Sequence, residues 1–194
     1  MILPCWNRRE PNEAVLRVAN VPDRKLDASL DKVPGDRKYV QEVRAYISRL
    51  KAALEAGDGL LLWGPYRSGK SSLAACVVRE VAAHRCRPYW LEAFALVDGW
   101  LAGEDDPRRR MVERAHLLVV DDLGTEGSFP FRKEIIETAL RLRMERRGAT
   151  VITTNLSQPD QIAANYGGKL MALLRECVHP IKVEGVDWNE GRDS

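Results

Sequence analysis

The chain has 194 residues, of which 45% are hydrophobic and 30% are charged, a composition that excludes disordered, collagen-like and coiled-coil classes and leaves room for one domain. Its formal net charge of +2 is too small to argue for nucleic-acid binding, which must therefore depend on local basic clusters. No apolar run approaches the roughly 20 residues that cross a bilayer and no signal-peptide core is present, so we expect a cytoplasmic protein without membrane contact.

The N-terminal part differs in pattern from the rest. Residues 1–37 contain prolines and charges without periodic hydrophobicity, which predicts an extended lead-in. From Lys38 to Leu54 apolar residues recur at steps of three and four, which predicts an amphipathic helix that ends at Gly57. We expect a folded core over 38–188 and a short tail over 189–194.

Apolar runs and helical stretches alternate through this core. The runs cover 60–63, 88–91, 117–120, 149–153 and 181–183, and the helical stretches cover about 70–84, 93–102, 130–147 and 158–176. This alternation predicts an α/β fold, a three-layer α/β/α sandwich around a parallel sheet of five strands.

A phosphate-binding loop follows the first apolar run. Residues 64–71 read GPYRSGKS and match GxxxxGK[ST] between a strand and a helix. Glycines let the loop N–H groups point at phosphate oxygens, Lys70 supplies charge to the β and γ phosphates, and the Ser71 hydroxyl is a ligand suited to Mg²⁺. The residues expected to bind the nucleotide are Gly64, Pro65, Tyr66, Arg67, Ser68, Gly69, Lys70, Ser71 and Ser72.

Polar residues end two later apolar runs. Leu117–Val120 leads into Asp121 and Asp122, and the carboxyl edge of a parallel sheet is where ligands bind. We expect Asp121 to hold Mg²⁺ through water and Asp122 to orient or deprotonate the attacking water. Asn155 could bond this water and the γ-phosphate, although an asparagine after a strand is also an ordinary turn residue.

The extra strand and helix near 88–102 separate the phosphate loop from the carboxylate strand. This order favours an ATPase with an additional strand over a nucleotide kinase, for which no acceptor pocket or lid can be identified. We therefore expect P-loop NTPase chemistry with ATP and Mg²⁺, in which Lys70, Asp122 and Asn155 act on the γ-phosphate and its water.

Basic residues gather at two places that could bind DNA phosphates. Arg108, Arg109 and Arg110 stand in an expected loop, and a second group crowds the end of the helix over 130–147. The alternative is a solvated face that complements the helix dipole. The second group contains Arg141, Arg143, Arg146 and Arg147.

The order of these motifs resembles the AAA+ ATPases of the DnaC-type helicase-loader and IstB-type transposition-helper group. The likeness spans about residues 22–188 and includes DASLD at 27–31, GPYRSGKS, LLVVDDLGTE at 117–126 and VITTN at 151–155. It implies an AAA+ core in which Lys70 and Ser71 bind nucleotide and magnesium, Asp121 and Asp122 form the acidic pair, and Asn155 is the first sensor.

The resemblance also implies a bacterial or phage setting and ATP-dependent homo-oligomers on DNA, with a replicative helicase or a transposase as partner. Family members carry an arginine that reaches a neighbour's γ-phosphate where this chain has Ala172–Leu174, so Lys169 or Arg175 would have to replace it. A slow ATPase of the helicase-loader type is the leading interpretation. The alternatives are a transposition helper and a nucleotide-gated binding module with little hydrolysis.

Overall fold

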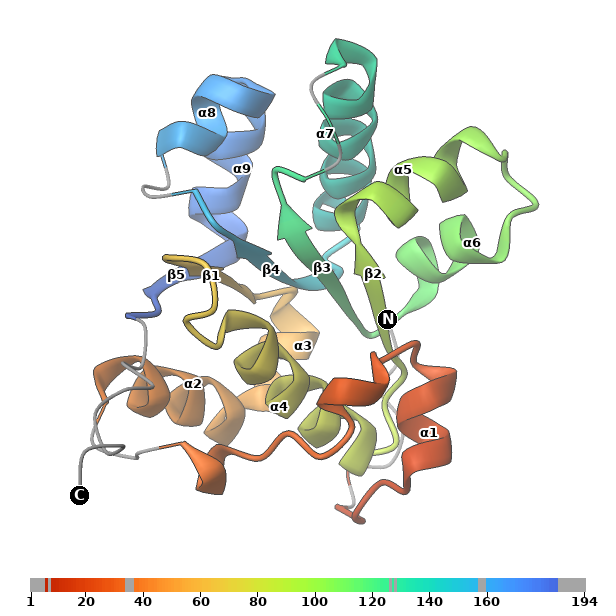
Figure 1. Ribbon diagram of the computed structural model, residues 1–194. Coiled ribbons are helices and arrows are strands. Elements are labelled where there is room, and N and C mark those ends of the chain that lie inside the picture. The colour runs from red at the N-terminus through yellow and green to blue at the C-terminus, as the bar shows by residue number, and fades with distance from the viewer. Residues whose placement is uncertain are drawn as a thin grey trace.

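The structure, a computed structural model, describes residues 6, 8–33, 37–125, 127, 129–156 and 160–184. Within these residues, five strands form one parallel sheet in the order β2-β3-β4-β1-β5 (Figure 1). The strands are β1 Gly59–Trp63, β2 Pro88–Glu92, β3 Leu117–Leu123, β4 Ala149–Thr154 and β5 Val178–Lys182. The predicted fold class is confirmed.

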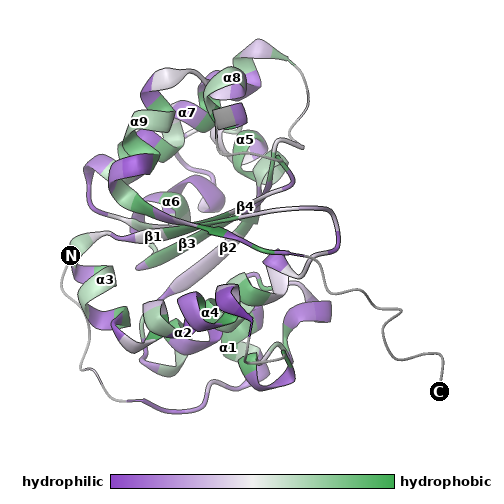
Figure 2. Cartoon of the chain, turned by 90° about the vertical axis from the view of Figure 1, so that its left-hand side faces the viewer, coloured by the Kyte–Doolittle hydropathy of each residue, from purple (hydrophilic) through white to green (hydrophobic). Residues whose placement is uncertain are grey.

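Helices cover both faces of this sheet, because successive strand side chains point to opposite sides. Leu60 and Leu62 belong to the core under α4, whereas Leu61 belongs to the core under α7 and α9, and Figure 2 shows the two helical layers. No helix within the described ranges is long and apolar enough to cross a membrane. The first layer contains α1 Glu13–Val18, α2 Lys38–Ser48, α3 Leu50–Ala56 and α4 Lys70–Ala83, and the second α5 Ala93–Leu101, α6 Pro107–Arg114, α7 Pro130–Glu145, α8 Asp160–Tyr166 and α9 Gly168–Cys177.

The prediction of an extended lead-in over residues 1–37 is wrong for its described part. Helix α1 and the 3₁₀ turns η1 Asp23–Lys25 and η2 Leu30–Lys32 occur there, and Leu16 and Leu26 are buried in the core. The Trp90 N–H donates to the Ala19 carbonyl at 2.8 Å, so this segment also covers the edge of β2. Residues 21–33, here named the N-terminal strap, cross the start of α4. The predicted tail at 189–194 lies outside the described residues.

Two segments predicted as single helices each form two shorter helices in the structure. Arg49 leaves the helical conformation (φ −107°, ψ 19°) between α2 and α3, and Gly167 (φ 90°) separates α8 from α9.

The loop expected around Arg108–Arg110 is helix α6 in the structure. The Asp106 side chain caps this helix by accepting from the Arg108 N–H at 2.8 Å, and Pro107 suits its first turn.

Candidate nucleotide-binding site

The loop between β1 and α4 requires glycine at two positions. Gly64 has φ 149°, and a Cβ there would lie 2.2 Å from the Val183 carbonyl oxygen, because the end of β5 pairs alongside. Gly69 has φ 97° and precedes α4, where within the described residues no side chain caps the helix. The first N–H groups of α4 therefore suit an anion.

Lys70 is buried beneath this loop, with 4% of its surface exposed. Its Nζ donates to the carbonyl oxygens of Gly64 at 3.1 Å and Pro65 at 2.7 Å, and to Ser68 Oγ at 3.3 Å. Burial lowers the pKa of Lys70, while the charges of Asp122 and Asp121 oppose this change. The loop thus holds an ammonium group that faces the acidic pair of β3.

Asp121 lies at the carboxyl end of β3, with 2% of its surface exposed. The Thr153 hydroxyl of β4 donates to its Oδ1 at 2.5 Å. Burial raises the pKa of Asp121, whereas hydrogen bonds from Thr153 and Ser71 lower it. Because the Ser71 hydroxyl and the Asp121 carboxylate meet here, the pair offers hard oxygen ligands of the kind that Mg²⁺ prefers.

Asp122 adopts an uncommon backbone conformation, with φ 56°. The register of β3 against β4 shifts between Val120 and Leu123, and the Asp122 N–H donates to Thr153 Oγ1 at 2.9 Å instead of to a strand carbonyl. Such a bulge turns a side chain away from its regular strand direction. The two consecutive carboxylates can therefore serve different roles.

Asn155 directly follows β4 and is half-buried. Thr154 pairs with Trp63 in the sheet, so Asn155 lies beside Gly64, the first residue of the phosphate loop. The Thr154 hydroxyl donates to the Leu123 carbonyl at 2.7 Å, which fixes this strand end against β3. The structure brings the loop, the acidic pair and Asn155 to one edge of the sheet.

Two parts of the site were missed by sequence reasoning. Thr153, in a run otherwise interpreted as an apolar strand, contacts both aspartates. A cavity of about 430 Å³ also lies between the N-terminal strap and the phosphate loop, lined by residues that include Lys25, Val33, Tyr39, Gly69 and Ser72. Within the part of the chain that the structure describes, the buried Tyr39 hydroxyl has no hydrogen-bond partner.

The remaining loop positions are more exposed. Arg67 has φ 62°, and its guanidinium lies 5.8 Å from the ring centroid of Tyr66, which is 75% exposed.

The two basic residues predicted to act on a neighbour's phosphate, Lys169 and Arg175, are both exposed on α9. They occupy its first and last turns, roughly 9 Å apart along the axis. The two residues therefore lie at opposite ends of α9.

The basic clusters are largely engaged within the chain. Arg108, Arg109 and Arg110 form ion pairs with Asp106, Glu104 and Asp105, and the Arg109 guanidinium also lies 4.3 Å from the Trp100 ring centroid.

Arg143 does not fit the predicted DNA contact, because it is 3% exposed. Its guanidinium donates to the carbonyl oxygens of Val112, Ala115 and Ala149 at 2.7–3.0 Å and to Thr150 Oγ1 at 3.1 Å. Arg146 and Arg147 remain exposed, and Arg146 pairs with Glu113 at 3.3 Å.

No family model and no curated protein sequence matches the chain. Among solved structures it is similar to the DnaC helicase loader, with a TM-score of 0.74 and 22% identity over 84% of this chain and 100% of that one. DnaI gives a TM-score of 0.73 and 22% identity over 88% of this chain and 98% of that one. The replication initiator DnaA bound to AMPPCP and single-stranded DNA gives 0.67 and 13%, over 84% of this chain and 51% of that one. The TM-scores show a likeness of fold: the chain has the P-loop α/β fold that these structures share, as its motifs predicted.

Proposed function

We propose that this chain binds ATP with Mg²⁺ and hydrolyses it. The observation that carries the proposal is the convergence of Ser71 and Thr153 on the buried Asp121 carboxylate, beside the buried Lys70 ammonium. A phosphate loop with a purely structural role would not require a buried cation and a buried anion from distant segments, because each charge is costly to remove from water. Their meeting at the edge where ligands bind in parallel sheets supports a nucleotide site.

The phosphate loop and the adjoining cavity can hold the two ends of the nucleotide. The N–H groups of the loop and the start of α4 would receive the phosphates, with Lys70 turning from the loop carbonyls to the β and γ phosphates. The cavity volume of about 430 Å³ falls within the range of roughly 300–1,000 Å³ typical of ligand pockets. Its apolar wall at Val33 and Leu73 suits a base, and the Tyr39 hydroxyl could bond to a base heteroatom.

Magnesium would be held by the Ser71 hydroxyl and, through water, by Asp121. When bound, this ion neutralises charge that develops on the β and γ phosphate oxygens. Asp122, turned out of the strand by its bulge, would accept a proton from the attacking water or orient it. Asn155 would donate to this water or the γ-phosphate, and Lys169 or Arg175 would act on the phosphate of a neighbouring subunit.

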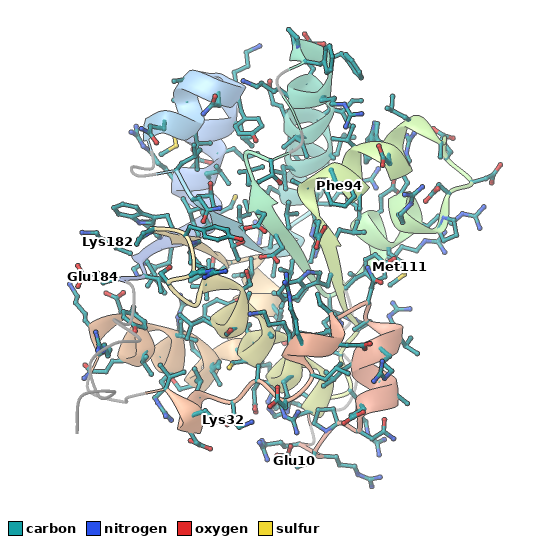
Figure 3. All side chains as sticks on the ribbon, viewed as in Figure 1. Glu10, Lys32, Phe94, Met111, Lys182 and Glu184 are labelled. Atoms are coloured by element: carbon teal, nitrogen blue, oxygen red, sulfur yellow. The ribbon has the colours of Figure 1, made fainter. Side chains whose placement is uncertain are left out.

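Exposed aromatic residues at the same edge support a DNA partner. Phe129 is 64% and Phe131 47% exposed at the start of α7, with ring centroids 6.0 Å apart, and the Arg132 guanidinium lies 6.0 Å from the Phe131 centroid. Phe94, 45% exposed, lies at the start of the neighbouring helix α5 (Figure 3). Aromatic rings beside cations are the usual platform for single-stranded bases.

The proposed activity is therefore that of a helicase-loader-like AAA+ protein that assembles on DNA with ATP and acts on a replicative helicase. The fold of DnaC and DnaI and the DNA-bound state of the DnaA structure support this choice. A transposition helper that acts with a transposase would use the same site. The leucines at 173 and 174, where an arginine would reach a neighbour's phosphate, favour a nucleotide-gated module with little hydrolysis as the second candidate.

The deciding experiment is steady-state ATP turnover with and without single-stranded DNA, with Lys70→Ala as the blank. Turnover above the blank that rises with DNA supports the loader-like function. ATP binding without turnover above the blank supports the gated module and contradicts the ATPase. Absence of both binding and turnover would overturn the proposed function.

A further inference from the structure

One cation near the phosphate loop comes from outside the predicted motifs. Lys25 ends the 3₁₀ turn η1 in the N-terminal strap and is half-buried. The next residue, Leu26, is 6% exposed and its carbonyl accepts from Arg79 of α4 at 3.0 Å. The backbone that carries Lys25 is therefore fixed on the same helix that begins at the phosphate loop.

The Lys25 ammonium lies at the first turn of α4. Its Nζ donates to Ser72 Oγ at 2.8 Å, and Ser72 directly follows Ser71, the residue that contacts Asp121. The charge of Lys25 interacts with both Asp121 and Asp122. Lys25 and Lys70 thus bring ammonium groups to one helix N-terminus from segments far apart in sequence.

The surroundings of this ammonium are suited to an anion. Lys25 and Ser72 both line the cavity of about 430 Å³ that reaches Gly69 of the phosphate loop. Ser72 Oγ is a neutral acceptor, and a half-buried cation gains more from a charged acceptor than from a hydroxyl. Burial and the neighbouring Arg24 lower the pKa of Lys25, whereas Asp121 and Asp122 raise it.

We propose that Lys25 is a phosphate-binding residue of the nucleotide site and that, through it, the bound nucleotide fastens the N-terminal strap to α4. This inference rests on the proposed nucleotide binding but adds a ligand from a segment outside the phosphate loop. Arg79 and Leu26 hold the strap close enough for Nζ to move from Ser72 Oγ to a phosphate oxygen at the same helix N-terminus. Nucleotide binding would then order the strap as well as the loop.

The first experiment compares nucleotide affinity by calorimetry for the full chain and for Lys25→Met, Lys25→Arg and Lys51→Met. Lys51 is an exposed lysine on α3 and serves as the matched control. We expect Lys25→Met to bind ADP and ATP roughly 10-fold or more weakly, which is the loss of one charged hydrogen bond. Lys25→Arg should retain affinity within about threefold, and Lys51→Met within about twofold.

The phosphate chain gives a second comparison. A loss for AMP, ADP and ATP alike would place Nζ at the α-phosphate, whereas a loss for ADP and ATP alone would place it further along the chain. Either pattern supports the inference. Equal affinity of Lys25→Met and Lys51→Met for all nucleotides overturns it, while leaving the proposed function intact. If Lys70→Ala and the unaltered chain bind alike, the proposed function itself fails.

Hydrogen exchange separates phosphate binding from a merely structural contact with Ser72. ADP should slow exchange of backbone amides in residues 21–33 of the unaltered chain and leave them unchanged in Lys25→Met. A structural role would instead make the strap of Lys25→Met exchange faster without nucleotide, with ADP still protecting it. That result would overturn the inference even if affinity fell.

Discussion

The hydroxyl of Thr153 donates to Asp121 Oδ1 at 2.5 Å and accepts from the backbone N–H of Asp122 at 2.9 Å. One buried threonine of β4 therefore orients the carboxylate proposed to hold Mg²⁺ and fixes the bulge that turns Asp122 out of β3. Groups that hydrogen-bond a metal-binding side chain fix its orientation and tune how it binds the metal. Thr153 links the two proposed roles of the acidic pair.

Replacing Thr153 with valine should lower ATP turnover about 10- to 100-fold, the range typical for loss of a residue that orients a metal ligand. The variant keeps the shape of the buried side chain but removes both hydrogen bonds. Turnover measured across Mg²⁺ concentrations checks this, with Thr153→Ser as the control that retains the hydroxyl. Unchanged turnover in Thr153→Val would show that the hydroxyl does not position the pair.

Replacing Asp121 with asparagine should stabilise the nucleotide-free chain while it abolishes Mg²⁺-dependent turnover. Burial raises the pKa of Asp121, so at pH 7 the carboxylate is less favourable in the folded chain than in the unfolded one. The amide oxygen can still accept from Thr153 and Ser71. Thermal unfolding without Mg²⁺ should show a Tm higher by a few degrees, since about 1 kcal/mol corresponds to roughly 2–4 °C at this size. A lower Tm would contradict the cost assigned to this carboxylate.

Replacing Asp122 with asparagine should lower turnover about 100-fold or more and leave ATP affinity within about twofold, because it removes a general base and no phosphate contact. Asparagine also tolerates the left-handed conformation found here, with φ 56°, so the backbone should not change. Single-turnover hydrolysis and ATP binding measured on the same sample check both parts. If the unaltered chain turns over no faster than this variant, the gated module is the better description.

Replacing Arg143 with methionine should lower the free energy of unfolding by about 3 kcal/mol or more, because several buried carbonyl oxygens lose their donor. Arg146→Met is the matched control, since that side chain is 61% exposed and should change stability by less than about 0.5 kcal/mol. Urea unfolding followed by circular dichroism gives both values. Similar stability of the two variants would mean that Arg143 does not join α6, α7 and β4.

The periodic parts of the chain were predictable because their hydrophobic patterns are local. The apolar runs Leu60–Trp63 and Leu117–Val120 predicted buried strands. The alternation of strands and helices predicted a parallel sheet of five strands, which the structure confirms. The packing of the N-terminal segment was not predictable in this way, because Leu16, Val21 and Leu26 are buried at steps of five residues, a spacing that matches neither a helix nor a strand. Asp106 and Pro107 did carry a helix-start signal that the basic run after them obscured.

Among the site residues too, those in local motifs were predictable and those placed by tertiary packing were not. Lys70, Ser71 and Asp121 stand in motifs whose spacing fixes their chemistry, so their meeting could be anticipated from one sequence. Thr153 and Lys25 reach the site through tertiary placement, since one depends on the register of β3 against β4 and the other on docking of the strap to α4. The prediction for Arg143 fails for a different reason: a charged residue in a basic run is expected at the surface, but this guanidinium donates to buried carbonyl oxygens.

Replacing Phe129 and Phe131 together with alanine should weaken single-stranded DNA binding about 10-fold or more, since stacking contributes roughly 1–3 kcal/mol for each base. Duplex DNA offers no unstacked bases, so its affinity should change less. Fluorescence anisotropy with a labelled oligonucleotide and its duplex, each with ATP present, measures both effects.

The control for this pair is Val18→Ala, which removes an exposed apolar side chain, 81% exposed, from α1 in the opposite helical layer. Its DNA affinity should match that of the unaltered chain. Because stacking is less sensitive to salt than phosphate contacts are, the loss in Phe129→Ala/Phe131→Ala should persist at higher ionic strength. A loss that vanishes as salt rises would assign DNA binding to cations such as Arg132 rather than to the aromatic pair, and would require Arg132→Met to reproduce it.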